Sequence, residues 1–180
     1  MQITDLKTLD YPPLTDDLEE AKSNLDKYGM ALIKDVLSQE EVEEMDQRLN
    51  EQFMGEEKYQ VGSKIRGDEG FGIESSEEEK VSRLVWNLIN KGDCFLKLID
   101  HPKILPLIQH MIGERVCLCS MGAHMNGSGN ERMALHQDQW PLVPHPMKFP
   151  FMANVMYLIS DNSPENGGTR LIPGSHKWPL

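Results

Sequence analysis

The sequence predicts an α+β fold in which helices come first and strands follow. Up to about residue 113, apolar residues recur at helical spacing behind helix-capping patterns. From about residue 115, strand-length segments alternate with stretches rich in Gly, Pro, Asn and Ser. The length of 180 residues suits one domain. We therefore expect a single domain over residues 1–180, with a helical part to about 113 and a β core from about 115 onward.

Two capping patterns near the N-terminus predict helices. Asp16 followed by Glu19 is typical of a helix start, and Gly29 suits the end of that helix. Ser38 and Glu41 form a capping box ahead of a second amphipathic helix. The apolar positions of this second helix are Val42, Met45, Leu49 and Phe53.

The next part of the helical half predicts three kinds of element. Residues 30–37 form an apolar run of strand length, whereas residues 54–74 are rich in glycine and charge and predict a loop. Ser76 and Glu79 repeat the capping box, which predicts a helix through about residue 92. Residues 102–113 predict one more helix. The apolar positions expected after the box at Ser76 are Val81, Leu84, Val85, Leu88 and Ile89.

Strand signals are confined mainly to the second half. The strand-length segments are residues 115–125, 132–138, 150–159 and 169–173. Apolar residues alternate through the third of them, so that one face should carry Phe151, Ala153, Val155, Tyr157 and Ile159.

Charge and composition exclude several classes of function. The net charge is −11, and residues 1–80 carry 22 acidic and 9 basic residues, which disfavours a nucleic-acid surface. No apolar stretch is long enough to cross a membrane, and no signal peptide begins the chain. Three cysteines without a CxxC pair favour a reducing compartment, so we expect a cytoplasmic protein.

The most informative short motif is His136-Gln137-Asp138. On a strand, residues two apart point to the same side, so the imidazole and the carboxylate can converge on one point. With one remote histidine, such a pair makes the facial triad of non-haem Fe(II) oxygenases. The alternative interpretation is an ordinary surface His–Asp pair of little energetic consequence.

The sequence around this motif resembles the phytanoyl-CoA dioxygenase family of Fe(II)/2-oxoglutarate-dependent oxygenases. After the HxD strand, that family has an Asn-Gly turn, a short strand and a PGSH motif, and residues 161–178 read DNSPENGGTRLIPGSHKW. In the first half, YGMALIKDVLS and HPKILPLIQHMIG also resemble the family. The resemblance implies helices packed on a double-stranded β-helix, which is a jelly-roll or cupin-like core.

The same resemblance implies the chemistry of the site. His136 and Asp138 would hold Fe(II), 2-oxoglutarate would chelate the metal as cosubstrate, and dioxygen would be the oxidant for a small organic substrate. A carboxylate at position 138, in place of Gly or Ala, favours hydroxylation over halogenation. Asn154 is a candidate amide donor to 2-oxoglutarate, with strand pairing as the equally open alternative. His176, within the PGSH turn, is expected to be structural.

The sequence departs from the family pattern after the PGSH motif. The family's second histidine and the arginine that anchors 2-oxoglutarate are missing before Leu180, and the strand signals number fewer than the eight of a jelly roll. We therefore expect the N-terminal two-thirds of an oxygenase, with an incomplete core and little activity. The alternative is a non-catalytic binding or scaffold module of the same fold. Weaker candidates for the missing groups are His124, His145 and Arg170, whereas Cys117 and Cys119 are expected to be buried small hydrophobes.

Overall fold

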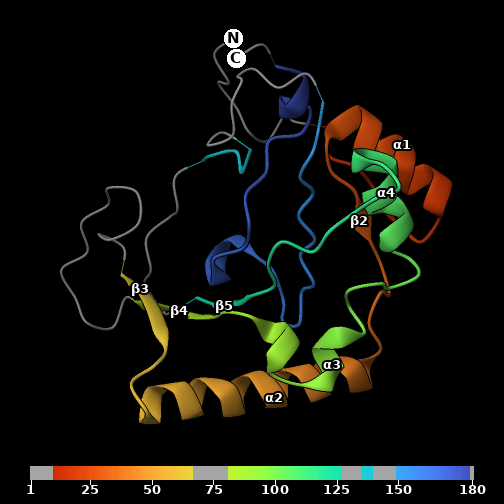
Figure 1. The fold of residues 1–180 in the computed structure, drawn as a ribbon. Coiled ribbons are helices and arrows are strands. Elements are labelled where there is room, and N and C mark those ends of the chain that lie inside the picture. Colours follow the sequence, from red (N-terminus) through yellow and green to blue (C-terminus); the bar gives the residue numbers. More distant parts are fainter. Residues whose placement is uncertain (1–9, 67–80, 127–134, 140–148, 179–180) are drawn as a thin grey trace.

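The computed structural model is α+β, as predicted, and describes residues 10–66, 81–126, 135–139 and 149–178. Its strands form two small sheets among these residues (Figure 1). In the first, β1 (Leu14–Thr15) pairs in parallel with β2 (Leu32–Ile33). In the second, β3 (Ser63–Arg66), β4 (Val81–Val85) and β5 (Ala123–Met125) are antiparallel in the order β3-β4-β5.

The helices of the described residues are mostly in the first two-thirds of the chain. The α-helices are α1 (Leu18–Tyr28), α2 (Gln39–Lys58), α3 (Asp93–Leu96) and α4 (Leu105–Ile112). Single 3-10 turns are η2 (Leu88–Asn90), η3 (Pro164–Asn166) and η4 (Ser175–Lys177). No described helix has the length and apolar character needed to cross a membrane.

Local capping defines the ends of the first two helices. The N-cap of α1 is Asp17, one residue later than predicted, and its Oδ1 accepts from the Glu20 amide at 2.7 Å. Gly29 ends α1 with φ 74°, as predicted. At α2 the predicted capping box is present: Ser38 Oγ accepts from the Glu41 amide at 3.2 Å, and the Ser38 amide donates to the Glu41 carboxylate at 2.8 Å.

Two predictions for the middle of the chain are wrong. The loop expected over residues 54–74 is helical to Lys58 and contains β3. The helix expected after Ser76 is strand β4 over residues 81–85, while Ser76 and Glu79 lie outside the described residues. The apolar spacing of this segment suits either structure, and pairing decides, because Leu84 lies opposite Ser63 on one side and His124 on the other. Two strands of the larger sheet therefore come from the half predicted to be helical.

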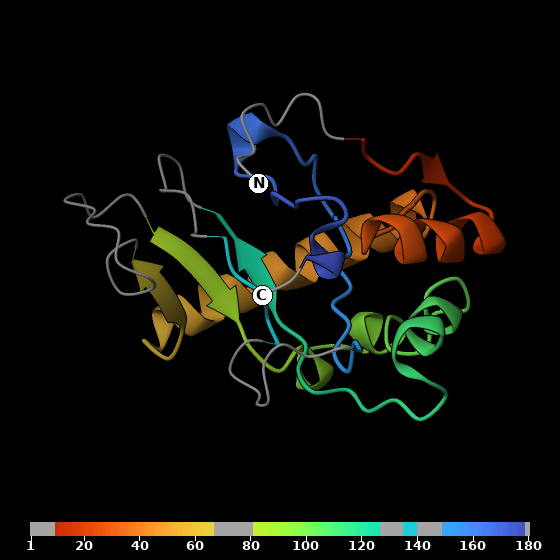
Figure 2. The ribbon, with the colours of Figure 1, turned by 90° about the horizontal axis from the view of Figure 1, so that it is seen from above.

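The main core lies between α2 and the three-stranded sheet, with α3 and η2 closing one end (Figure 2). Its buried members are Met45, Leu49, Phe53, Val85, Leu88, Cys94, Phe95 and Leu98. Partly buried side chains from later segments pack against it: Met121, Ala123, Tyr157 and Ile159. The acidic face of α2 is exposed, as its amphipathic pattern requires.

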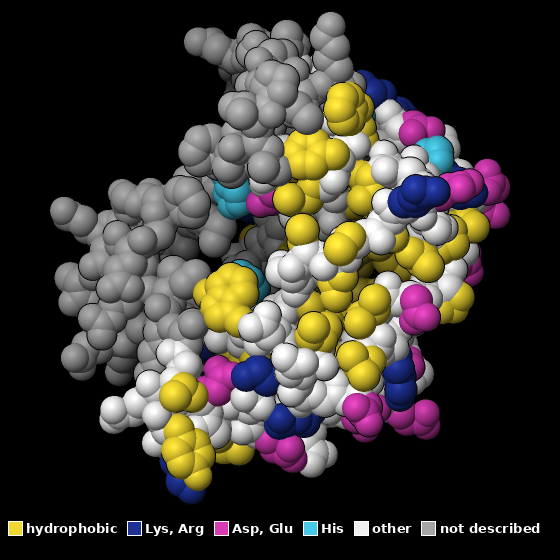
Figure 3. Space-filling model, in the orientation of Figure 1, with side chains coloured by type: hydrophobic (Ala, Val, Ile, Leu, Met, Phe, Trp, Pro, Cys, Tyr) yellow, Lys and Arg dark blue, Asp and Glu magenta, His cyan; other side chains and the backbone are white. Residues whose placement is uncertain are grey.

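The segment after residue 149 is extended and lies between the larger sheet and the α1–α4 pair in both ribbon views. The predicted alternation holds at the end of the segment, since Tyr157 and Ile159 pack on the core while Met156 and Leu158 are exposed, but Val155, predicted on the same face, is exposed. On the side of the molecule seen in Figure 1, hydrophobic side chains gather over the central part of the surface (Figure 3). Within the described residues, the strands predicted at 150–159 and 169–173 are not assigned, and only Ala123–Met125 of 115–125 pairs in a sheet. Extended backbone without a paired neighbour does not count as a strand.

The PGSH turn is attached to the C-terminal end of α1. The Gly174 amide donates to the Tyr28 carbonyl at 2.7 Å, and His176 Nε2 lies 3.3 Å from the Asp26 carbonyl oxygen. Gly29 is in contact with the His176 ring. His176 therefore has a structural place in the fold, as the sequence predicted.

Candidate metal centre

The structure brings together the three residues that the sequence singled out. His136 and Asp138 lie in the segment 135–139, which is not assigned as a strand and turns at residues 138–139, with His136 Nε2 at 3.4 Å from Asp138 Oδ1. Asn154 comes from the later extended segment, and its Nδ2 donates to Asp138 Oδ2 at 2.6 Å. The two side chains of the HxD motif are 36% and 51% exposed, so the pair is accessible from solvent.

Gln139 holds the two segments of the site together. Its Oε1 accepts hydrogen bonds from the Phe151 amide at 2.9 Å and the Met152 amide at 3.1 Å. One residue earlier, Asp138 contacts Asn154, two to three residues after the partners of Gln139. The sequence analysis missed this role of Gln139, because no spacing or composition signal marks a glutamine that caps backbone amides.

The donor set fits a first-row divalent metal ion. Imidazole nitrogen suits iron, zinc, copper and nickel. Two histidines and one carboxylate, with open coordination positions, are typical of non-haem Fe(II) oxygenases. Two donors that each lie about 2.1 Å from one ion are separated by about 3.0–3.4 Å for angles of about 90–110°. The 3.4 Å between His136 Nε2 and Asp138 Oδ1 falls in this range. Within the described ranges, no group of three His, Cys, Asp or Glu residues could hold a metal.

Among the described residues, the weaker candidate His124 does not join this pair in a group that could hold a metal. His124 lies on β5 opposite Leu84, and desolvation lowers its pKa although the residue keeps more than a third of its surface exposed. Arg170 is exposed on the C-terminal extended segment. His145 lies outside the described residues.

The cysteines do not form part of a site among the residues that are described. Cys117 and Cys119 are exposed, so the prediction that they are buried is wrong; no strand of the described residues pairs with the segment that carries them. Cys94 is the buried thiol, at 4% exposure, and burial raises its pKa. A protonated, buried thiol acts as a small core hydrophobe.

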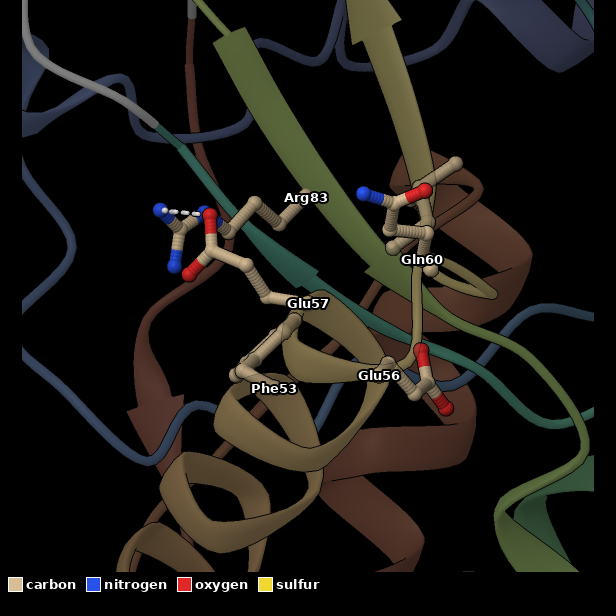
Figure 4. Close-up of a pocket in the computed structure, with 7 residues that line it drawn as sticks. Phe53, Glu56, Glu57, Gln60 and Arg83 are labelled. Carbon is tan, nitrogen blue, oxygen red and sulfur yellow. Dashed lines mark hydrogen bonds and ion pairs between the residues drawn. The ribbon is translucent and has the colours of Figure 1, made fainter.

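A separate small pocket lies where α2 meets the larger sheet (Figure 4). It has a volume of about 230 Å³. Glu57 and Arg83 point toward each other across it, with Arg83 Nη2 at 3.4 Å from Glu57 Oε1. Its lining residues are Phe53, Glu56, Glu57, Gln60, Gly62, Arg83 and Leu84. None of the three residues of the candidate metal centre lines this pocket.

Glu56 at this end of α2 is buried with its partners in place. Burial opposes ionisation, but hydrogen bonds from Lys91 Nζ at 2.8 Å and Gln52 Nε2 at 2.9 Å outweigh it and lower the pKa of Glu56. The carboxylate therefore has a structural role, holding α2 to the turn after η2.

Comparisons with known proteins identify the family of the chain. Residues 25–180 match the family described as phytanoyl-CoA dioxygenase (PhyH). Curated relatives include dioxygenase af480 of Aspergillus fumigatus, 28% identical over 165 residues that make up 92% of this chain and 51% of the relative. Dioxygenase sphC of Aspergillus fumigatus is 24% identical, covering 91% of this chain and 46% of the relative. Dioxygenase swnH2 of Arthroderma benhamiae is 26% identical, covering 92% and 56%.

The chain thus spans about half the length of the curated relatives it matches. No solved structure gives a significant match. The family implies a cupin or jelly-roll fold, and the family match covers every residue of the candidate metal centre. The chain belongs to the phytanoyl-CoA dioxygenase family.

Proposed function

We propose that this chain carries two protein ligands, His136 and Asp138, of the Fe(II) centre of a 2-oxoglutarate-dependent oxygenase that hydroxylates a small organic substrate. The observation that carries the proposal is the pairing of His136 Nε2 and Asp138 Oδ1 at 3.4 Å, on one short segment and open to solvent. A buried or widely separated pair would not leave room for a metal with free coordination positions. Bound iron, with 2-oxoglutarate and dioxygen, would supply the oxidising power for hydroxylation.

The residues of this chain contribute binding and orientation. The imidazole and the carboxylate would fix the metal on the segment 135–139, and Gln139 ties that segment to residues 151–152. A third protein ligand and a cationic anchor for 2-oxoglutarate are still required, and within the described residues no third ligand joins the pair. The third ligand and the cationic anchor would come from other parts of the protein, as the resemblance to the family implies.

The names of the relatives support an oxygenase without defining a substrate. All three are called dioxygenases. Fold alone does not identify a substrate, because one fold serves many chemistries. The unpaired cysteines of the described residues favour action in a reducing compartment such as the cytoplasm.

The test is Fe(II)-dependent conversion of 2-oxoglutarate to succinate by the protein expressed from its complete reading frame. We expect turnover in the wild type and its loss in His136→Ala and in Asp138→Ala. The matched control is His110→Ala, because His110 forms a different His–Asp pair, with Asp26 of α1 at 2.9 Å. That variant should keep wild-type turnover.

Two outcomes would contradict the proposal. Full turnover in His136→Ala would show that this histidine holds no catalytic metal. Absence of 2-oxoglutarate turnover in the wild type, with metal binding intact, would favour a non-catalytic binding module of the same fold.

A further inference from the structure

We propose that Asn154 is a positioning residue that orients Asp138 for metal binding, rather than a ligand of the cosubstrate. This inference rests on the proposed function, since it concerns the same site. Its observation is the hydrogen bond from Asn154 Nδ2 to Asp138 Oδ2 at 2.6 Å. The sequence offered 2-oxoglutarate as a partner for this amide, and the structure gives the amide a partner within the protein.

The two carboxylate oxygens of Asp138 have separate partners. Oδ1 faces His136 Nε2 at 3.4 Å, and Oδ2 accepts from the Asn154 amide. A carboxylate rotates freely about its last bond when it is exposed, and each rotation would exchange the two oxygens. The hydrogen bond from the Asn154 side-chain amide to Oδ2 holds the carboxylate in one orientation, which keeps Oδ1 beside the imidazole. Hydrogen bonds of this kind to a ligating group orient it and raise metal affinity.

Asn154 is placed by contacts that do not involve Asp138. On one side, Gln139 Oε1 accepts from the amides of Phe151 and Met152. On the other side, the Tyr157 hydroxyl donates to the Leu98 carbonyl at 2.8 Å, with the Tyr157 ring against the core. The backbone that carries Asn154 is therefore fixed on both sides within three residues. A donor fixed in this way can orient a more mobile partner.

The experiment measures metal and cosubstrate affinity separately. Mn(II), a redox-stable probe for the site, is titrated into the apoprotein and the free ion is followed by EPR; 2-oxoglutarate is then titrated into the Mn(II)-loaded protein. We expect Asn154→Ala to weaken the Kd for Mn(II) about tenfold, with the Kd for 2-oxoglutarate at saturating Mn(II) changed less than about twofold. Asn154→Gln keeps an amide donor at this exposed position and should recover most of the affinity.

The chain offers a closely matched control. Asn50 Nδ2 donates to Asp46 Oδ2 at 3.1 Å on the exposed face of α2, which is the same chemical pair at a distance from the site. Asn50→Ala should leave the Kd for Mn(II) unchanged. A thermal unfolding curve for each variant checks that the fold is intact.

Each other outcome would overturn the inference in a distinguishable way. If Asp138→Ala weakens Mn(II) binding and Asn154→Ala does not, the positioning role is wrong and the metal site stands. If Asn154→Ala weakens only 2-oxoglutarate binding, Asn154 is a cosubstrate ligand, which is one of the two roles that the sequence left open. If Asp138→Ala binds Mn(II) as the wild type does, the metal assignment fails and the positioning role fails with it.

Discussion

Replacing Gly29 by alanine should destabilise the protein in a way that depends on His176. Gly29 has φ 74°, in the left-handed region, where a Cβ costs about 1–2 kcal/mol. A Cβ built on Gly29 would also overlap the His176 ring, lying 2.7 Å from its Cγ; because the ring is exposed, it can turn away, at a cost of about 0.5–1 kcal/mol. We therefore expect Gly29→Ala to lower the free energy of unfolding by about 2 kcal/mol.

The second part of this cost should vanish when the ring is removed. His176 is exposed and makes one long contact, to the Asp26 carbonyl at 3.3 Å, so His176→Ala alone should cost less than about 0.5 kcal/mol. In the double variant only the backbone cost of Gly29→Ala remains. The cycle should therefore give a coupling energy of about 0.5–1 kcal/mol between positions 29 and 176.

Urea denaturation of the four proteins, followed by far-UV circular dichroism, measures this coupling. It tests whether the PGSH turn is seated on α1, which is the contact that ties the end of the described chain to its beginning. A coupling energy below about 0.3 kcal/mol, within the additivity expected of independent sites, would refute the reasoning. The turn would then not be packed on α1 in solution.

Three further predictions concern the core and its polar contacts. Lys91→Met leaves the buried Glu56 carboxylate without its ammonium partner and should cost about 1–3 kcal/mol in urea denaturation, with part of the loss recovered when Glu56→Gln is added. Cys94 should react with a thiol reagent much more slowly than the two exposed cysteines until the protein unfolds; fast reaction of three thiols in the native protein would contradict its burial. Tyr157→Phe removes the hydrogen bond to Leu98 and should cost about 1 kcal/mol at neutral pH. Burial raises the pKa of Tyr157 to about 12, so the stabilising contribution of this phenol is complete below pH 10 and is lost as the pH rises toward 12. The difference in unfolding free energy between wild type and variant should therefore shrink over that interval. A constant difference would argue against a buried phenol.

Sequence reasoning was most successful where a single local interaction determines the structure. The capping box at Ser38 needs only Glu41 three residues later, and the end of α1 needs only a residue that tolerates a positive φ at Gly29. His136 and Asp138 also come together as the HxD spacing predicts, although Asp138 lies in a turn and not on the predicted strand.

Sequence reasoning failed where the local structure is determined by contacts between residues far apart in the sequence. Residues 81–89 have apolar spacing that suits a helix, but β3 and β5 pair with residues 81–85 and make them a strand. The exposure of Cys117 depends on whether another strand covers its segment, which alternation alone does not reveal. The partner of Asn154 depended on the register between two segments, and that register is set by Gln139, whose role has no sequence pattern.

The most direct test of the central claim is whether the His136 imidazole binds the metal. Pulsed EPR on the Mn(II)-loaded protein detects the nitrogen of a directly coordinated histidine. We predict that the wild type shows coordinated histidine nitrogen, that His136→Ala shows one coordinated nitrogen fewer, and that His110→Ala, whose histidine pairs with Asp26 instead, matches the wild type. A nitrogen signal that persists unchanged in His136→Ala, or its absence from the wild type, would contradict the assignment of His136 as a metal ligand.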